Sequence, residues 1–107
     1  MQNKINKLFK AIADPTRRDI FHALILATSA LSITQISNQF EISRQGVTKH
    51  IKTLQEAGLV NIDAQGRERF CNANAKPLKD VNKWIQFYSQ FWDTKLDSLG
   101  DYLDEKN

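Results

Sequence analysis

The chain has 107 residues, which suits one domain and is too short for two domains with separate hydrophobic cores. Hydrophobic residues make up 41% and charged residues 25%, which is ordinary for a globular protein, and only four Gly and two Pro argue against a disordered or linker-rich chain. The single cysteine, Cys71, excludes an internal disulfide and a structural zinc site built on several thiolates, so we expect a cytoplasmic protein.

The formal net charge of +3 is unevenly distributed. Residues 1–92 contain 13 of the 15 Lys and Arg but 7 of the 12 Asp and Glu, whereas residues 93–107 contain two lysines and five acids. The first part of the chain is therefore the part suited to a polyanion. No run of about 18 apolar residues occurs, so no membrane partner is expected.

Four helices are predicted in the first half of the chain. Residues 5–12 carry apolar side chains at helical spacing, and Asp14 followed by Pro15 is typical of the start of a second helix. The second helix is expected to turn Ile20, Phe21, Leu24 and Ile25 to the core. A loop over residues 27–30 then leads to Ser32, the expected cap of a third helix with Ile33, Ile36 and Phe40 on its buried face.

Ser43 is the expected cap of a fourth helix, whose inner face carries Val47, Ile51 and Leu54 and which ends at Gly58. Two strands, at residues 59–64 and 67–72, are predicted to pair as a hairpin around Gln65 and Gly66. A last helix, capped by Asn74, covers about residues 75–103 and has Pro77 in its first turn. The predicted order is α-α-α-α-β-β-α.

The two helices between Ser32 and Gly58 are joined by about three residues, the spacing of a helix-turn-helix. The second begins with polar side chains suited to the DNA major groove, because Arg pairs with guanine and Gln with adenine. A basic hairpin directly after it is typical of a wing. We therefore predict a mainly α fold with a small β-hairpin, a winged helix-turn-helix in one domain over residues 1–107, that binds double-stranded DNA.

The residues expected at the DNA are Thr16, Arg17, Ser43, Arg44, Gln45, Gly46, Thr48, Lys49, His50, Lys52, Gln65, Gly66, Arg67 and Arg69. Gly46 is included because the absence of a side chain would let the helix approach the DNA closely. For His50, contact with DNA and a hydrogen bond within the helix-turn-helix are equally compatible with the sequence. For Arg17 and Arg18, one is expected at the DNA backbone and the other beside Asp14 or another acid.

Residues 9–20 (FKAIADPTRRDI) and 42–60 (ISRQGVTKHIKTLQEAGLV) resemble two signature segments of the ArsR family of bacterial winged-helix repressors. The resemblance covers nearly the whole chain. It implies a homodimer that binds an operator near its own promoter and blocks transcription. It also implies that the first and last helices, here 1–13 and 75–105, form the dimer. Its twofold symmetry predicts a pseudo-palindromic operator with half-site centres roughly 34–36 Å apart.

Metal-sensing members of that family carry a Cys-x-Cys pair before the recognition helix, or His and carboxylate ligands on the last helix. In this chain residues 31–36 contain no thiol and the last helix contains no His. We interpret the acids of the last helix, Asp93, Asp97, Asp101 and Asp104, as a hydrated face. The expectation is a metal-independent autorepressor with no metal and no cofactor.

Six of the ten aromatic residues lie on the last helix, more than one core face requires. A twofold interface is the favoured interpretation, and a pocket for an organic effector lined by Trp84, Tyr88 and Trp92 is the alternative. The residues expected at the dimer interface are Ile5, Leu8, Phe9, Trp84, Tyr88, Phe91, Trp92 and Leu99.

Two other functions stay open at this point. One is a winged-helix adaptor that binds proteins instead of DNA. The other is a thiol-responsive sensor, because strand alternation places Cys71 and Phe70 on opposite faces and brings one of them near the surface. An enzyme is not expected, since Cys71 and His50 are the only conceivable nucleophile and base and would share no cleft.

Overall fold

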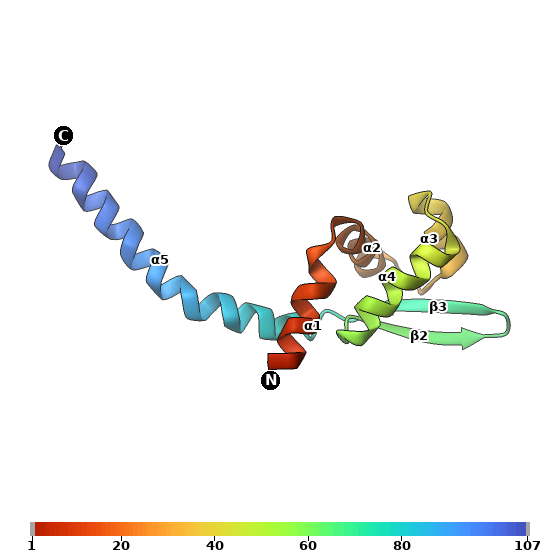
Figure 1. The fold of residues 1–107 in the computed structure, drawn as a ribbon. Coiled ribbons are helices and arrows are strands. Elements are labelled where there is room, and N and C mark those ends of the chain that lie inside the picture. Colours follow the sequence, from red (N-terminus) through yellow and green to blue (C-terminus); the bar gives the residue numbers. More distant parts are fainter. Residues whose placement is uncertain (1, 107) are drawn as a thin grey trace.

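The computed structural model describes residues 2–106, and within them the side chains of residues 3–92. Its elements, in chain order, are α1 (Gln2–Ala13), α2 (Pro15–Leu26), β1 (Leu31–Ser32), α3 (Ile33–Phe40), α4 (Arg44–Glu56), β2 (Val60–Gln65), β3 (Glu68–Ala73) and α5 (Leu78–Lys106). The first four helices and the sheet form one body, and α5 extends away from it (Figure 1). No helix in the described part of the chain is both long enough and apolar enough to cross a membrane.

Side-chain caps fix where three of the helices begin. The Asp14 carboxylate accepts a hydrogen bond from the backbone N–H of Arg17 at 2.9 Å, with Pro15 in the first helical position. Ser32 and Gln35 form a reciprocal capping box at the start of α3, and the Ser43 hydroxyl caps α4. All three caps were predicted from the sequence and are confirmed.

The sheet has three antiparallel strands in the order β1-β3-β2, so β3 is central. The two longer strands each lie one residue later than predicted, because Gln65 pairs with Glu68 and leaves Gly66 and Arg67 as the turn. Gly66 has a φ of 64°, the left-handed conformation that such a tight turn requires. Strand β1 was not predicted, because its two residues pair with residues some 40 positions away and carry no periodicity of their own.

The last helix begins at Leu78, three residues later than predicted, and Asn74 is not its cap. The Asn74 side-chain oxygen accepts a hydrogen bond from the backbone N–H of Lys76 at 3.2 Å and so stabilises a turn before the helix. The backbone N–H of Leu78 bonds to the carbonyl of Ala75, which closes that turn. Pro77 therefore lies just before α5 and not in its first turn.

The core lies between the helices and the sheet. Its fully buried side chains include Leu8, Ile20, Ile36, Ile51, Leu54, Leu59 and Cys71. The predicted inner faces of α3 and α4 are confirmed, whereas Ile25 of α2 was wrongly placed inside and is 43% exposed. Leu8 is a second correction, because it was expected at the dimer interface and is 0% exposed in the core of its own subunit.

Candidate nucleic-acid interface

The N-terminal half of α4 presents a row of exposed polar side chains. The helix starts at Arg44 because the Ser43 hydroxyl accepts a hydrogen bond from the backbone N–H of Gly46 at 3.0 Å. With Val47 and Ile51 buried, helical periodicity turns the intervening positions outward. The exposed residues on this part of the helix are Arg44, Gln45, Thr48, Lys49 and Lys52.

Gly46 packs against the turn before α4. The prediction that its missing side chain lets the helix approach DNA closely is wrong. A Cβ atom at this position would lie 2.8 Å from the Ile42 side chain and 3.2 Å from the Ser43 hydroxyl. The missing side chain therefore makes room for Ile42 at the turn, and the Cβ direction faces the protein.

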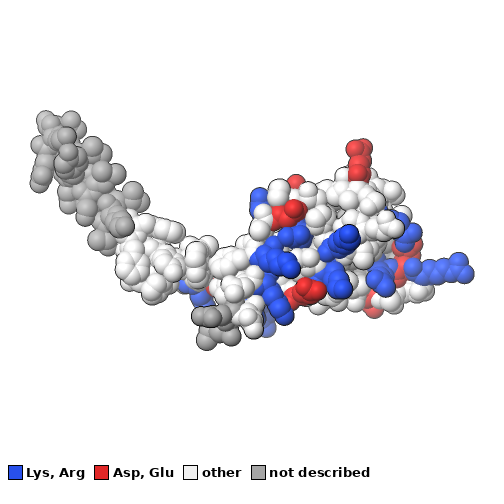
Figure 2. All heavy atoms as spheres, viewed as in Figure 1, with Lys and Arg blue, Asp and Glu red and all other residues white. Residues whose placement is uncertain are grey.

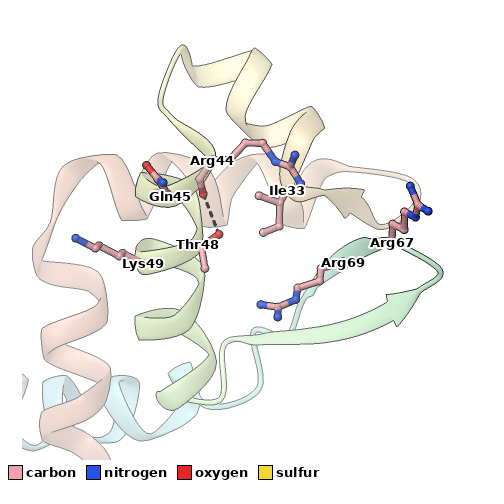
Figure 3. Close-up of a pocket in the computed structure, with 7 residues that line it drawn as sticks. All are labelled: Ile33, Arg44, Gln45, Thr48, Lys49, Arg67 and Arg69. Carbon is pink, nitrogen blue, oxygen red and sulfur yellow. Dashed lines mark hydrogen bonds between the residues drawn. The ribbon is translucent and has the colours of Figure 1, made fainter.

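The hairpin β2–β3 lies beside α4 and forms the second side of an open groove of about 790 Å³. Figure 3 shows Arg69 extending from β3 toward α4, and Arg67 at the hairpin turn. Gln45 and Lys49 extend from the other flank of α4 in the same view. The residues that line the groove are Ile33, Arg44, Gln45, Thr48, Lys49, Arg67 and Arg69.

The groove is positively charged, because its lining contains four cations and no acid. Lys and Arg are spread over the body of the molecule, whereas the described part of α5 is mostly uncharged in the same view (Figure 2). A groove with this charge suits a phosphate backbone, which cations bind independently of sequence. The Thr48 hydroxyl donates to the Arg44 carbonyl at 2.8 Å and keeps its lone pairs available as acceptors.

The remaining predicted DNA residues on the hairpin and α4 lie at the margins of the groove. Lys52 lines a neighbouring hollow of about 300 Å³ together with Thr48 and Arg69. The Gln65 amide donates to the Asp63 carboxylate at 3.2 Å, and Gly66 is exposed with open space around it. These positions are compatible with the edge of a DNA contact.

Arg17 is placed differently from the other predicted DNA residues. Its Nε donates to the carbonyl of Ala11 at 2.8 Å and its Nη2 to the carbonyl of Lys10 at 2.7 Å. Its Nη1 lies 3.4 Å from Nδ1 of His50. The guanidinium therefore satisfies the last carbonyls of α1 and contacts α4.

Arg18 also caps α1, because its Nη1 donates to the carbonyl of Ile12 at 2.6 Å and to that of Ala13 at 3.2 Å. The expectation that one of the two arginine side chains pairs with Asp14 is corrected accordingly. The Asp14 carboxylate is bound by the backbone N–H of Arg17, which holds the pKa of that carboxyl below its ordinary 3.8, while the positive charge of Arg17 adds to the effect.

Comparisons with known proteins agree with this geometry. A helix-turn-helix domain model matches residues 12–63. The uncharacterized HTH-type transcriptional regulator YuzN of Bacillus subtilis (strain 168) is 36% identical over 92 residues, 80% of this chain and all of that protein. The transcriptional repressor SdpR of the same organism is 30% identical over 81 residues, 76% of this chain and 88% of that protein.

Among solved structures, the crystal structure of an ArsR family transcriptional regulator superposes with a TM-score of 0.78 and 27% identity. The match covers 87% of this chain and 94% of that one. The chain belongs to the ArsR family. It is a winged helix-turn-helix transcriptional regulator with a helix-turn-helix DNA-binding domain, and the resemblance stated from residues 9–20 and 42–60 is confirmed.

In this ArsR-family chain, the aromatic residues of α5 from Trp84 to Trp92 lie at the surface. Trp84, Tyr88, Phe91 and Trp92 are between 43% and 52% exposed. Phe9 of α1 packs edge-on against Trp84 with ring centroids 5.1 Å apart, and Ile5 is half-buried. Leu99, also expected at the interface, and the acids from Asp93 onward lie outside the residues whose side chains are described.

Two alternatives from the sequence can be compared with this ArsR-family structure. Cys71 is fully buried on β3, and burial raises the pKa of its thiol to about 11, so the reactive thiolate is disfavoured. An apolar hollow of about 460 Å³ does occur between α1, α2 and Leu78, but Trp84, Tyr88 and Trp92 do not line it. Among the described residues, no three His, Cys, Asp or Glu gather into a metal-binding group.

Proposed function

We propose that this ArsR-family regulator is a homodimeric repressor that binds a pseudo-palindromic operator near its own promoter and senses no metal. The observation that carries the proposal is the groove between α4 and the hairpin, with Arg44, Lys49, Arg67 and Arg69 along it and no acid in its lining. The N-terminal half of α4 enters the major groove, and the hairpin lies along the adjacent backbone or minor groove.

Base reading belongs to the first turn of α4. Arg44 and Gln45 are exposed, and their side chains carry the paired donors and acceptors that suit guanine and adenine. Thr48, one turn on, retains an acceptor within the groove.

The lysines of α4 and the arginines of the hairpin bind phosphate. Lys49, Arg67 and Arg69 are exposed cations that line the groove, and Lys52 is an exposed cation in the hollow next to it. A flexible cation positions DNA without reading its sequence. Gly46 supports α4 from the protein side.

Dimerisation belongs to α1 and α5. Five aromatic side chains of α5, from Trp84 to Trp92, are 43% to 56% exposed, which is unusual for so many large rings on one helix. A twofold partner that covers the same helix would bury them, and aromatic residues are favoured in the core of such interfaces. Because the chain carries no thiol over residues 31–36, we propose that no metal controls this dimer.

The proposal is tested by selecting bound sites from random duplexes and by a gel shift on the DNA upstream of the gene, at two salt concentrations. We expect a pseudo-palindromic site and a complex that weakens steeply with salt. In the same assay Arg44→Ala and Gln45→Ala should each relax base preference at their own position, at a cost of about 1–3 kcal/mol per lost bidentate contact.

A matched control is Gln39→Ala, which removes an exposed glutamine of α3 that does not line the groove. This variant should select the same site as the wild type. Equal weakening of Arg44→Ala and Gln45→Ala on every DNA sequence would contradict their role as base readers. The absence of any salt-sensitive complex would instead support a protein-binding adaptor and overturn the proposal.

A further inference from the structure

One guanidinium group, that of Arg17, connects three helices, α1, α2 and α4. Arg17 belongs to the first turn of α2, and its Nε and Nη2 bind the carbonyls of Ala11 and Lys10 at the end of α1. Its Nη1 lies 3.4 Å from Nδ1 of His50 on α4. This contact joins residues that are 33 positions apart in the chain. It links α2 to the polar half of α4.

The chemistry of this contact favours one tautomer of the imidazole. A guanidinium carries only donors, so a hydrogen bond from Arg17 to His50 needs a free lone pair on Nδ1, which is the tautomer that carries its proton on Nε2. The Asp14 carboxylate, held by the backbone N–H of Arg17, adds a negative charge to the same cluster. His50 is half-buried, unlike its exposed neighbour Lys49.

The same cluster is connected to the proposed dimer helices. Phe9 packs against Trp84 of α5 with ring centroids 5.1 Å apart, and the two carbonyls that Arg17 binds follow Phe9 directly along α1. Helix α1 contacts both α4 and α5 (Figure 1). A continuous series of contacts therefore runs from α5 through α1 and Arg17 to His50 on α4.

We propose that Arg17 and His50 are positioning residues that hold α4 at a fixed place relative to α1, and that they thereby set the distance between the two recognition helices of a dimer. The inference rests on the proposed function, because it concerns how a dimer meets two half-sites. It assigns specificity for half-site spacing to two residues that contact no base.

This role differs measurably from a direct contact of His50 with phosphate. A phosphate contact strengthens binding to every operator alike, and its loss lowers the salt dependence by roughly 0.9 per contact. A positioning contact instead penalises operators whose half-sites are displaced. One inserted base pair shifts a half-site by about 3.4 Å and rotates it by about 34° around the DNA axis.

The experiment compares the affinity of full-length protein for its selected operator with its affinity for versions lengthened or shortened by one central base pair. The wild type should prefer the native spacing, and His50→Ala should reduce that preference on the order of fivefold with an unchanged salt slope. His50→Asn, which keeps an acceptor at the δ position, should restore most of the preference. Arg17→Lys keeps the charge but cannot reach two carbonyls and the ring together, so it should behave like His50→Ala.

His22→Ala is the matched control, because it removes the chain's other histidine, which is exposed on α2. It should leave both affinity and spacing preference unchanged. If His50→Ala does not fold, His50→Gln takes its place in the comparison. Its side-chain acceptor lies one bond further out than Nδ1 and so does not replace it. An unchanged spacing preference in the folded variants, or a uniform loss with a lower salt slope, would overturn the inference, whereas a wild type that binds no operator would overturn the proposed function itself.

Discussion

Asp14 both caps α2 and carries a charge, so its protonation makes the stability of the folded chain depend on pH in the acid range. Its carboxylate accepts the backbone N–H of Arg17, and this bond is the main reason that its pKa lies below 3.8 in the folded protein. Folding therefore favours the ionised form. The resulting stabilisation is present above about pH 3.8 and is lost as the pH falls through the lowered pKa.

Asp14→Asn separates the charge from the cap, because asparagine caps helices as well as aspartate does. We expect the wild type to lose unfolding free energy relative to this variant as the pH falls from 5 to below 3.8. Chemical denaturation of both proteins across that pH range measures the difference between their unfolding free energies. The other acidic residues are common to both proteins, so their contributions cancel in this difference. A difference that does not change with pH would show that the charge of Asp14 contributes nothing to folding.

Cys71 should be unreactive in the folded protein. Its side chain is fully buried, and burial raises the pKa of the thiol from 9.0 to about 11, so the thiolate is scarce at pH 8. A thiol-specific disulfide reagent should modify the native protein far more slowly than the denatured chain. Rapid modification of the native protein would return the thiol-responsive sensor to consideration.

Single residues also show what could not be predicted from the sequence alone. Helical spacing placed Leu8 on an apolar stripe, but a stripe does not tell whether it faces the core of its own subunit or a partner. Gly46 was recognised as a place of close approach, yet the approaching group is Ile42 and not DNA. The contact between Arg17 and His50 could not be predicted, because only the packing of α2 on α4 brings them together.

The hairpin is the element whose contribution can be measured most directly. Arg67 and Arg69 are exposed cations on β3 and its turn, and both line the groove beside α4. If each binds one phosphate, Arg67→Ala and Arg69→Ala should each lower the salt slope of operator binding by roughly 0.9 per subunit. Base preference should stay unchanged, because these contacts carry no sequence information.

Lys76→Ala is a suitable control for the hairpin variants, since Lys76 is an exposed cation just before α5 that does not line this groove. Filter binding or fluorescence anisotropy over a series of salt concentrations gives the slopes. Equal slopes for Arg67→Ala, Arg69→Ala and the wild type would remove the hairpin from the DNA contact.

Most elements were predictable because their signals are local. Asp14, Ser32 and Ser43 are caps that act within three residues, and the inner faces of α3 and α4 follow a helical period. Strand β1 has no such signal, because it exists only through its pairing with β3. The start of α5 was misplaced because the local turn at Asn74 competes with helix formation over the same residues.

At the scale of the whole molecule, the shape is far from spherical. The chain measures 67 × 31 × 23 Å along its principal axes, because α5 extends beyond the body that its first turns pack against. Trp92 lies on this helix, 48% exposed, on the same side as Trp84 and Tyr88. An exposed apolar surface of this kind is the basis of the proposed dimer.

Trp92→Glu should therefore yield a monomer and abolish tight operator binding, because an interface that buries an unpaired charge loses several kcal/mol. Gln86→Glu is the matched control, since it adds the same charge on the opposite face of α5. Sedimentation equilibrium measures the mass of each protein. A dimer mass retained by Trp92→Glu would remove this residue from the subunit interface.

The central position of β3 has a consequence for how the chain is made. The strand that leads into α3 pairs only with β3, Leu31 opposite Cys71 and Ser32 opposite Phe70. During synthesis, residues 32–58 therefore emerge from the ribosome before the strand that anchors them has emerged. A fragment ending at Gly58 would carry the side chains proposed to read bases and still lack the scaffold that holds them in register, so the proposed DNA-reading unit is complete only once Ala73 has emerged from the ribosome.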